Sequence, residues 1–455
     1  MGTDGIDYMF QATEGLPIDV RFMLPSCVPA TPMDESGANL DYRAIDSFYD
    51  YPRVQGLAEM MNSYGVIHND PEVVSKIVAS QAHHKKIDGH APGLQGKDLD
   101  TYVAAGVYSD HECATMEDAL AKLQRGQFIM IREGTAARNL EALAPLLTPQ
   151  YAERCMFCTD DKHPSDLLEK GHIDYIAREA INKYGVDPII AVKAACHHAS
   201  RYFLLNNRGA IAPGYLADFA VIDNFKDFNV EMVFKKGILY WNNGELRDFE
   251  APKIEEYLDK RAHDTFHVST LTPDDFRDTR QRGVLGMVPG EIITTDNGYA
   301  DHVDLEKDIL KIAVVERHKG THHIGLGYIQ GYGLKSGAVA TSISHDSHNI
   351  IVVGTNSADM AFAANYIVEH HGGIVVVENG TVKGDVVLEI AGIMSDRPLT
   401  EVNDQLEAAK DAAFTLGVSR GIDPFMTLSF MALPVIPKLR ITTRGVIDVD
   451  TQQYV

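Results

Sequence analysis

Four polar side chains stand directly after apolar, strand-like runs of this sequence, and their types are those that bind divalent metals in hydrolases. They are Glu59, His90, His111 and Asp160. The intervals between them, 31, 21 and 49 residues, suit strand–loop–helix units, the last interval being two units long. In a (β/α)8 barrel the carboxyl ends of the strands meet on one face, where such ligands can converge. The spacing therefore predicts metal-dependent hydrolysis.

Some of these residues also have a structural interpretation that needs no metal. Glu59 could be a surface residue at the start of a helix at Met60, where it would favour the helix dipole. A lone histidine is usually a hydrogen-bonded structural residue. His90, however, stands in the turn-forming stretch 88–93, and His111 ends the next strand along the chain. Two imidazoles that converge on one cleft favour a divalent ion.

The neighbours of these candidates receive different interpretations. Asp160 is a candidate metal ligand, whereas Asp161 could simply cap the following helix. We expect Glu112, beside the second histidine, to point the other way and to orient a loop or a neighbouring ring. Cys155 and Cys158 have the spacing of a zinc knuckle, but no second pair follows them. We interpret them as buried strand cysteines.

A charged cluster follows the predicted strand 128–131. It contains Arg132, Glu133, Arg138 and Asn139. A solvated helix start is one interpretation of this cluster. The alternative is that Arg132 or Glu133 faces the same cleft as the metal candidates. There either residue could hydrogen-bond a substrate or brace the residues that do.

A second cluster, His345, Asp346 and His348, precedes the predicted strand 350–354. Taken alone, it could be a further metal site, a hydrolase-like loop or a polar turn. The pattern argues against a Ser-His-Asp relay with Ser347, because adjacent residues cannot point at one another in the geometry it needs. We favour a loop that folds over the mouth of the barrel and contacts the substrate.

The elements that must position these residues alternate between strand and helix up to about residue 205. We expect strands at 20–24, 54–57, 86–87, 105–108, 128–131 and 155–158, and helices at 71–82, 98–105, 116–124 and 173–184. This alternation predicts parallel strands and a barrel rather than an open sheet. A closed barrel has eight strands, and the chain begins with helix-like spacing over 5–15. We therefore expect residues 1–205 to form a barrel that is incomplete at its N-terminal end.

The pattern changes after residue 205. Short alternating strands at 216–223, 230–234 and 236–240 predict part of a small β-sandwich domain over 206–250. Residues 251–455 form a third region, with apolar strands at 309–315, 350–353, 374–377 and 386–390 and helices at 357–369 and 401–416. This region is predicted to be a separate α/β or α+β domain.

Composition narrows the classes of function. A formal charge of −23 argues against binding to nucleic acid, which requires a basic surface. No apolar run reaches the 18 residues that a membrane span needs, and the first residues do not look like an export signal. Five cysteines on such a chain predict reduced thiols and a cytoplasmic location.

Several stretches resemble the adenine deaminases of the amidohydrolase superfamily. They are 24–30 (LPSCVPA), 88–94 (DGHAPGL), 130–140 (MIREGTAARNL), 157–161 (FCTDD) and 341–349 (TSISHDSHN). The resemblance covers the chain from residue 4 onward. It implies hydrolysis of adenine to hypoxanthine and ammonia, in purine salvage or catabolism. The arginine-containing eleven-residue stretch is its most specific part.

The resemblance also implies roles for individual residues. Glu59, His90, His111 and Asp160 would bind a divalent metal, and Asp160 would take a proton from the nucleophilic water and pass it to the leaving amine. His111 and Glu59 would share in catalysis. Manganese is the expected metal, with iron and zinc as alternatives, and the centre would be binuclear in the complete enzyme. The expected partner is adenine, with no nucleic acid and no membrane, and the chain is expected to form a homodimer.

The chain also departs from the family pattern. Family members begin the barrel with a strand that carries a His-x-His pair, and no such pair is present here. The chain therefore resembles the C-terminal three quarters of an adenine deaminase. Two alternatives remain: a catalytically inactive remnant that keeps the substrate cleft, or another amidohydrolase that acts on a cyclic amide or amidine. Ring-opening relatives use a carboxylated lysine where this chain has Glu59.

Overall fold

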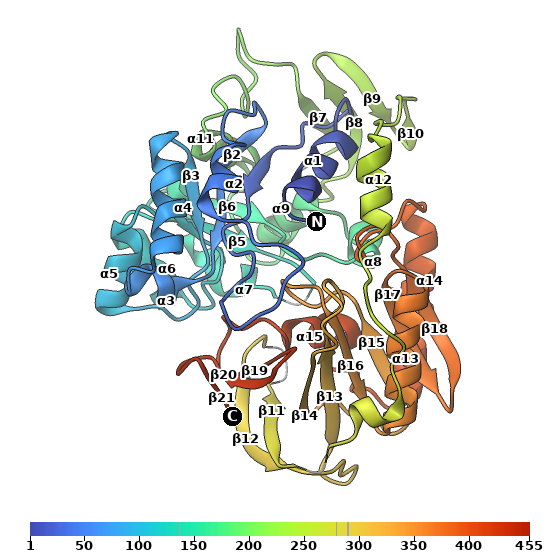
Figure 1. Cartoon of the computed structure of the whole chain (residues 1–455). Helices are drawn as coiled ribbons and strands as arrows, with labels where there is room; N and C mark the ends of the chain where they lie inside the picture. The colour runs from blue at the N-terminus through green and yellow to red at the C-terminus, as the bar shows by residue number, and fades with distance from the viewer. Residues whose placement is uncertain (136, 279, 289–290) are drawn as a thin grey trace. The chain divides into compact units, whose positions relative to one another are not determined.

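The computed structural model describes residues 1–135, 137–278, 280–288 and 291–455. Ala136, inside the arginine-containing stretch, lies outside the described residues. The chain folds into two compact units (Figure 1). One consists of Met9–Ser26 and Asp41–Lys253, and we call it the barrel unit. The other consists of Met1–Tyr8, Cys27–Leu40 and Ile254–Val455, and we call it the C-terminal unit. The three-domain division expected from the sequence stays a prediction.

The barrel unit contains six short parallel strands within its described residues. They are β1 (Phe22–Leu24), β2 (Val54–Met60), β3 (Lys86–Gly89), β4 (Ser109–Asp110), β5 (Phe128–Arg132) and β6 (Cys155–Cys158). They pair in the orders β1-β2-β3 and β4-β5-β6, and every pairing is parallel. The amide of Tyr108 donates to the carbonyl of Ile87, at 2.9 Å, and so links the two sets. The predicted parallel strands are confirmed.

Helices connect these strands. They are α2 (Tyr42–Asp46), α3 (Ser63–Ile67), α4 (Pro71–Ala82), α5 (Gly96–Ala104), α6 (Met116–Gln124), α7 (Leu140–Leu143), α8 (Pro164–Glu169), α9 (Ile173–Asn182), α10 (Pro188–Val192) and α11 (His198–Tyr202). Five of them begin at side-chain caps. The Asp70 carboxylate accepts from the amides at the start of α4, and the Thr115 hydroxyl accepts from the Asp118 amide in α6. The bounds of α4 and α6 match the predicted 71–82 and 116–124.

One predicted strand is misplaced. The expected strand at 105–108 is not formed; α5 ends at Ala104, and β4 begins only at Ser109. Gly106 lies between them with a φ of +98°, a backbone conformation that favours glycine. This residue turns the chain between helix and strand, so the strand starts later than the apolar pattern indicates.

A small antiparallel sheet completes the barrel unit. Its strands are β7 (Phe219–Ile222), β8 (Val230–Lys235), β9 (Ile238–Asn242) and β10 (Glu245–Leu246), in the order β10-β9-β8-β7. The predicted short strands of this region are confirmed in type and order. The sheet carries Trp241, the single tryptophan of the sequence, on β9.

The C-terminal unit is built on a mixed sheet of eight strands, in the order β12-β11-β14-β13-β16-β15-β17-β18. The strands are β11 (Arg282–Met287), β12 (Thr294–Ala300), β13 (Ile309–Val315), β14 (Ile324–Gln330), β15 (Ala338–Thr341), β16 (Ile350–Gly354), β17 (Gly373–Glu378) and β18 (Thr381–Val387). Only the β11–β14 pair is parallel among these neighbours. A second, three-stranded sheet has the order β19-β20-β21, with β19 (Leu439–Thr442), β20 (Gly445–Asp448) and β21 (Gln453–Tyr454).

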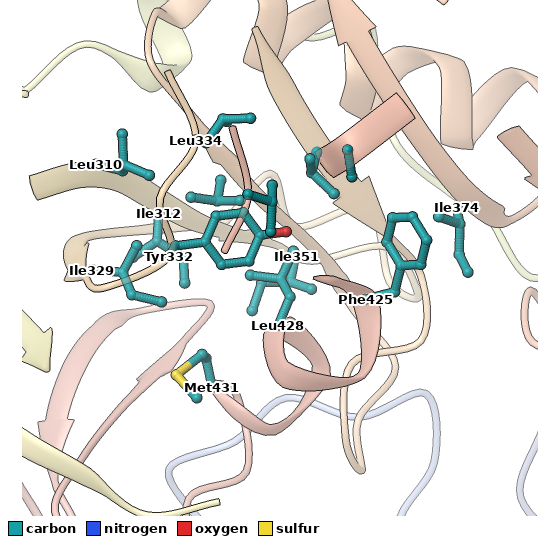
Figure 2. Packing of buried hydrophobic residues seen from close by; sticks show 14 of the residues in the cluster. Leu310, Ile312, Ile329, Tyr332, Leu334, Ile351, Ile374, Phe425, Leu428 and Met431 are labelled. Carbon is teal, nitrogen blue, oxygen red and sulfur yellow. The ribbon is translucent and has the colours of Figure 1, made fainter. Parts of the chain in front are cut away.

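Both faces of the large sheet are covered. Alternate residues of β13 belong to two different cores: Ile312 and Val314 to one, Ala313 and Val315 to the other. The first core includes residues of α14 (Leu399–Thr415) and α15 (Pro424–Phe430), and the second includes residues of α13 (Ser357–Glu369). Figure 2 shows part of the first core, including Leu310, Ile312, Ile329, Tyr332, Leu334, Ile351, Ile374, Phe425, Leu428 and Met431. Burial on both faces explains why these strands are continuously apolar in sequence.

The segment Cys27–Leu40, near the N-terminus, belongs to the C-terminal unit. Within Cys27–Leu40, the Glu35 carboxylate accepts hydrogen bonds from the Thr443 hydroxyl at 2.5 Å and from Arg444 Nη2 at 3.1 Å. It also lies 3.0 Å from His323 Nδ1. Burial would raise the pKa of Glu35, but these partners outweigh it and hold that pKa below its ordinary value. The remaining helices are α1 (Thr3–Ala12) at the start of the chain and α12 (Glu256–His263) in the C-terminal unit.

Candidate functional site

The carboxyl ends of β2, β3 and β4 bring together Glu59, His90 and His111. Glu59 is the penultimate residue of β2, and the two histidines directly follow β3 and β4. Glu59 Oε2 lies 3.2 Å from His90 Nδ1 and 3.0 Å from His111 Nε2. The centroids of the two imidazole rings are 5.3 Å apart. The structure therefore places three of the four predicted ligands in mutual contact.

The three groups shift one another's ionisation. Burial would raise the pKa of Glu59, but its hydrogen bonds to His111 and His90 outweigh it and hold that pKa well below the ordinary value. Burial would lower the pKa of His111, but Glu59 raises it to about 10. For His90, Glu112 and Glu59 likewise overcome burial and raise the pKa. The carboxylate and the two imidazoles therefore favour one another's charged forms.

This geometry fits a divalent ion. The ligand atoms of Glu59, His90 and His111 all lie within 4.8 Å of one another. Separations of 3.0 and 3.2 Å are close to those of two ligands that share one ion at bond lengths of about 2.0–2.2 Å. The other ring nitrogen of His90, Nε2, is buried and has no hydrogen-bond partner among the described residues. A mixed set of imidazoles and a carboxylate suits manganese, iron or zinc.

Asp160 joins the group from β6. It stands two residues after that strand with a φ of +56°, and its Oδ2 lies 3.9 Å from His111 Nε2. Burial would raise the pKa of Asp160, but His111 and Arg132 outweigh it and lower that pKa. Its carboxylate is therefore ionised at neutral pH, and the side chain is one third exposed.

The Glu112 side chain does not point in the direction predicted from the sequence. We expected it to point away from His111, but its Oε1 lies 3.4 Å from His111 Nε2 and 3.5 Å from His90 Nδ1. The expectation assumed that strand alternation continues through the residue, whereas β4 ends at Asp110. Beyond that point the chain bends, so two consecutive side chains can turn toward the same cluster.

Arg132, the last residue of β5, ties Glu112 to Asp160. Its guanidinium bonds both carboxylates and is buried, as is the Glu112 side chain. Of the two interpretations left open by the sequence, these contacts favour Arg132 as a brace for site residues. They also supply Glu112 with the positive charge that a buried carboxylate requires.

Asn139 is a positioning residue that the sequence indicated only as part of a polar cluster. Its Oδ1 accepts from the Arg132 amide at 2.6 Å, and its Nδ2 donates to the carbonyls of His111 at 3.1 Å and Cys113 at 3.0 Å. It therefore links the ends of β4 and β5. Glu133 forms a backbone bridge with Arg138, and burial raises the pKa of its carboxyl. A role for Glu133 in substrate binding stays a prediction.

The loop that carries His345, Asp346 and His348 lies in the C-terminal unit. His345 Nδ1 contacts the Asp346 carboxylate, and the His345 ring stacks on Phe430 with centroids 5.3 Å apart. Burial lowers the pKa of His348 to about 4, so this ring is neutral at physiological pH. The buried Arg317 guanidinium donates to the carbonyl of His348 and fixes the backbone there. Contact of this loop with a substrate stays a prediction.

All five cysteines are unpaired, and burial raises the pKa of both Cys155 and Cys158. Neither thiol is therefore activated as a nucleophile.

Among the described residues, no helix is both long enough and apolar enough to cross a lipid bilayer.

Two family models match the chain. The model of the amidohydrolase family matches residues 1–239, and that of the adenine deaminase C-terminal domain matches residues 291–453. The first covers β1 to β6 and the whole Glu59–His90–His111 group.

Curated relatives match over the whole chain. An adenine deaminase of Desulfatibacillum aliphaticivorans is 45% identical over 463 residues, which include 100% of this chain and 80% of the relative. Adenine deaminase 2 of Carboxydothermus hydrogenoformans is 42% identical, over 99% of this chain and 80% of the relative. Similar shares are covered in an adenine deaminase of Nitratidesulfovibrio vulgaris strain DP4, at 44% identity.

Solved structures match a smaller part. A beta-aspartyl dipeptidase from Fervidobacterium islandicum AW-1, in complex with a beta-Asp-Leu dipeptide, is 17% identical with a TM-score of 0.36, over 46% of this chain and 62% of that chain. An adenosine deaminase from Xanthomonas campestris with bound zinc is 14% identical with a TM-score of 0.33, over 46% and 56%. Likenesses of this size carry no argument about function.

Proposed function

Because this chain belongs to the adenine deaminase family, we propose that it hydrolyses adenine to hypoxanthine and ammonia at the Glu59–His90–His111 site. The observation that carries the assignment to this site is the convergence of these three side chains from three successive strand ends. The family belongs to the metal-dependent amidohydrolases, so the site takes a divalent ion. Manganese is our proposal for its identity, with iron or zinc as alternatives, and we expect a binuclear centre in the complete enzyme.

An ion held by Glu59, His90 and His111 would lower the pKa of a water molecule toward neutrality and so provide the nucleophile. The residues of the chain then move protons and hold charge. Asp160 takes a proton from the attacking water as the oxygen bonds to the purine carbon that carries the amine. It returns this proton to the leaving nitrogen, so that the carbon–nitrogen bond breaks and ammonia departs. The remaining hydroxyl proton ends on a ring nitrogen of hypoxanthine.

Arg132 and Glu112 keep Asp160 ready for both steps. His111 and Arg132 favour the carboxylate form, so Asp160 can accept a proton at neutral pH. Glu112 balances the guanidinium and lies beside both imidazoles. The charges around the nucleophile are thus fixed before the substrate arrives, which is how preorganised sites lower a barrier.

Specificity and assembly complete the proposal. A site that hydrogen-bonds the edges of adenine rejects guanine, whose donors differ, because unpaired buried polar groups cost about 1–3 kcal/mol each. Nucleosides are rejected by bulk. We assign Arg132, Glu133, His345, Asp346 and His348 to substrate contacts or to their support. The chain functions as a homodimer, and its free thiols fit the reducing cytoplasm.

The test is ammonia release from adenine by the purified chain with added manganese. His90→Ala and Asp160→Asn should abolish turnover while circular dichroism stays unchanged, because each removes a ligand or the proton carrier. His68→Ala is the matched control, since that exposed histidine of the same unit lies at the end of α3. Metal analysis should find bound ions in the control and fewer in His90→Ala. Equal turnover of adenosine and adenine, or full activity of both variants, would contradict the proposal.

The same assays on the purified chain distinguish the two alternatives, an inactive remnant and a ring-opening amidohydrolase. A catalytically inactive remnant would bind no metal and release no ammonia. A ring-opening amidohydrolase would consume a cyclic amide without producing ammonia from adenine. Glu59 at the position of the carboxylated lysine of such enzymes speaks against the latter.

A further inference from the structure

A fully buried ion pair lies beside the site without any part in the proposed chemistry. Lys122 of α6 and Asp110, the last residue of β4, have side chains with 0% exposure, and Nζ lies 2.9 Å from Asp110 Oδ2. The ammonium also donates to Asp118 Oδ2 at 3.1 Å and to the carbonyl of Ala91 at 2.8 Å. These three acceptors use all three donors of the lysine.

The Asp110 carboxylate is fixed on both oxygens. Oδ1 accepts from the amide of Ala91 at 2.8 Å, and Oδ2 accepts from the amide of Glu112 at 2.9 Å and from Cys113 Sγ at 3.2 Å. Ala91 directly follows His90 in the chain, and Glu112 directly follows His111. The ion pair thus holds the backbone immediately after each of the two histidines.

Stability alone does not explain this pair. A buried ion pair pays a large desolvation cost, and well-packed apolar residues of similar volume are often equally stable in its place. Apolar residues could not form the hydrogen bonds that this pair makes to the backbone. Asp110 and Lys122 bind the amide and the carbonyl of Ala91, and Asp110 also binds the amide of Glu112. Groups that orient metal-binding histidines from behind are a recurrent feature of metal sites.

We propose that Asp110 and Lys122 are positioning residues that set the metal affinity of the site by fixing the turns that carry His90 and His111. The proposal rests on the assignment of these histidines as ligands. α6 follows the His111 turn along the chain, and its lysine reaches back to the turn after His90. One side chain therefore fixes the separation of two ligands that come from different strands.

The test is the affinity of the full-length chain for manganese, measured by calorimetric titration of metal-free protein. Lys122→Met keeps the length and volume of the side chain and removes its three hydrogen bonds. We expect its affinity to be about 10–100-fold weaker than that of the wild type. Leu143→Ala, a cavity variant in the core of the same unit, is the control for a general loss of stability and should bind as the wild type does.

A double variant separates positioning from charge balance. Asp110→Asn combined with Lys122→Met removes the unpaired buried charge, so stability should recover in part. The amide nitrogen that replaces Oδ2 cannot accept from the Glu112 amide, so the weak metal affinity should persist. If Lys122→Met alone does not accumulate as folded protein, the manganese affinity of Asp110→Asn tests the same role. This variant keeps the acceptor for the Ala91 amide and loses the acceptor for the Glu112 amide.

The outcomes are distinct. Wild-type affinity in folded Lys122→Met, or its return in the double variant, would overturn the positioning role and leave the metal site intact. Absence of manganese binding by the wild type would overturn the proposed function and this inference together. Weak binding by both variants with normal binding by Leu143→Ala supports the inference.

Discussion

Replacement of Arg132 by methionine tests how the site balances its charges. The Arg132 and Glu112 side chains are only 7% and 4% exposed, and the guanidinium donates to both oxygens of the Glu112 carboxylate. Methionine keeps an apolar stem of similar reach and removes the guanidinium. It leaves the buried carboxylate of Glu112 without its main partner.

The expected cost follows from this burial. Removal of one partner from a buried ion pair costs about 3–5 kcal/mol, because the remaining charge is left uncompensated. The imidazoles of His90 and His111, 3.5 and 3.4 Å from Glu112, retain part of the compensation. The contact of Arg132 with Asp160 adds little to the cost, because Asp160 is one third exposed and solvent screens its charge. We therefore expect the free energy of unfolding of the barrel unit to fall by about 2–4 kcal/mol.

Trp241 makes this loss measurable in one unit. It is the single tryptophan of the chain and lies in the barrel unit, so its fluorescence during urea unfolding reports on that unit. The measurement is made with a chelator at pH 7, so that changes in metal binding do not enter. Arg138→Met is the control: its guanidinium is 47% exposed and lies 4.0 Å from Asp166, a contact worth about 0–1 kcal/mol.

The double variant Arg132→Met with Glu112→Gln decides the cause. If the loss comes from an unpaired buried charge, neutralisation of Glu112 should restore at least half of it. A loss below about 1 kcal/mol in the single variant would refute the reasoning, since a buried pair should cost more. So would a double variant no more stable than the single one.

Three further predictions concern other contacts. Tyr102→Phe removes a buried hydroxyl that donates to the Met60 carbonyl at 2.7 Å and accepts from the His90 amide at 3.0 Å; it should lower unfolding free energy by about 1–3 kcal/mol in urea titrations. Burial raises the pKa of Asp34 to about 7, so its contribution to stability should decline between pH 4 and 7 as the unfolded carboxyl ionises first, and calorimetry of Asp34→Asn should show a weaker decline. Removal of metal by dialysis against a chelator should abolish turnover and lower the melting temperature, and manganese at 100 times its Kd should restore about 2.7 kcal/mol.

The position of the candidate site could be predicted from sequence because parallel strands share one edge for their carboxyl ends. Glu59, His90 and His111 each follow an apolar run, and the alternation of strand and helix determines that these runs point the same way. The pattern needs no knowledge of side-chain packing. The same reasoning identified Asp160 after β6, though its role as a ligand stays a prediction.

The contacts that support the site could not be predicted in this way. The direction of Glu112 depends on how the chain bends after β4, and the end of that strand was misjudged by two residues, at 108 in place of Asp110. The pairing of Lys122 with Asp110 depends on how α6 packs, because the hydrophobic period of a helix does not specify the partner of a buried charge. Periodicity locates elements, whereas polar contacts between their ends depend on three-dimensional packing.

The segment Cys27–Leu40 bears on how the chain is synthesised. Glu35 is translated 409 residues before Arg444, one of its partners in the C-terminal unit. At about 5–20 residues per second, roughly 20–80 s pass on the ribosome before this contact can form. During that time the barrel unit can assemble around a segment that has no place in it. Folding of this protein therefore cannot proceed strictly from one end to the other, and the segment must stay available until the last residues emerge.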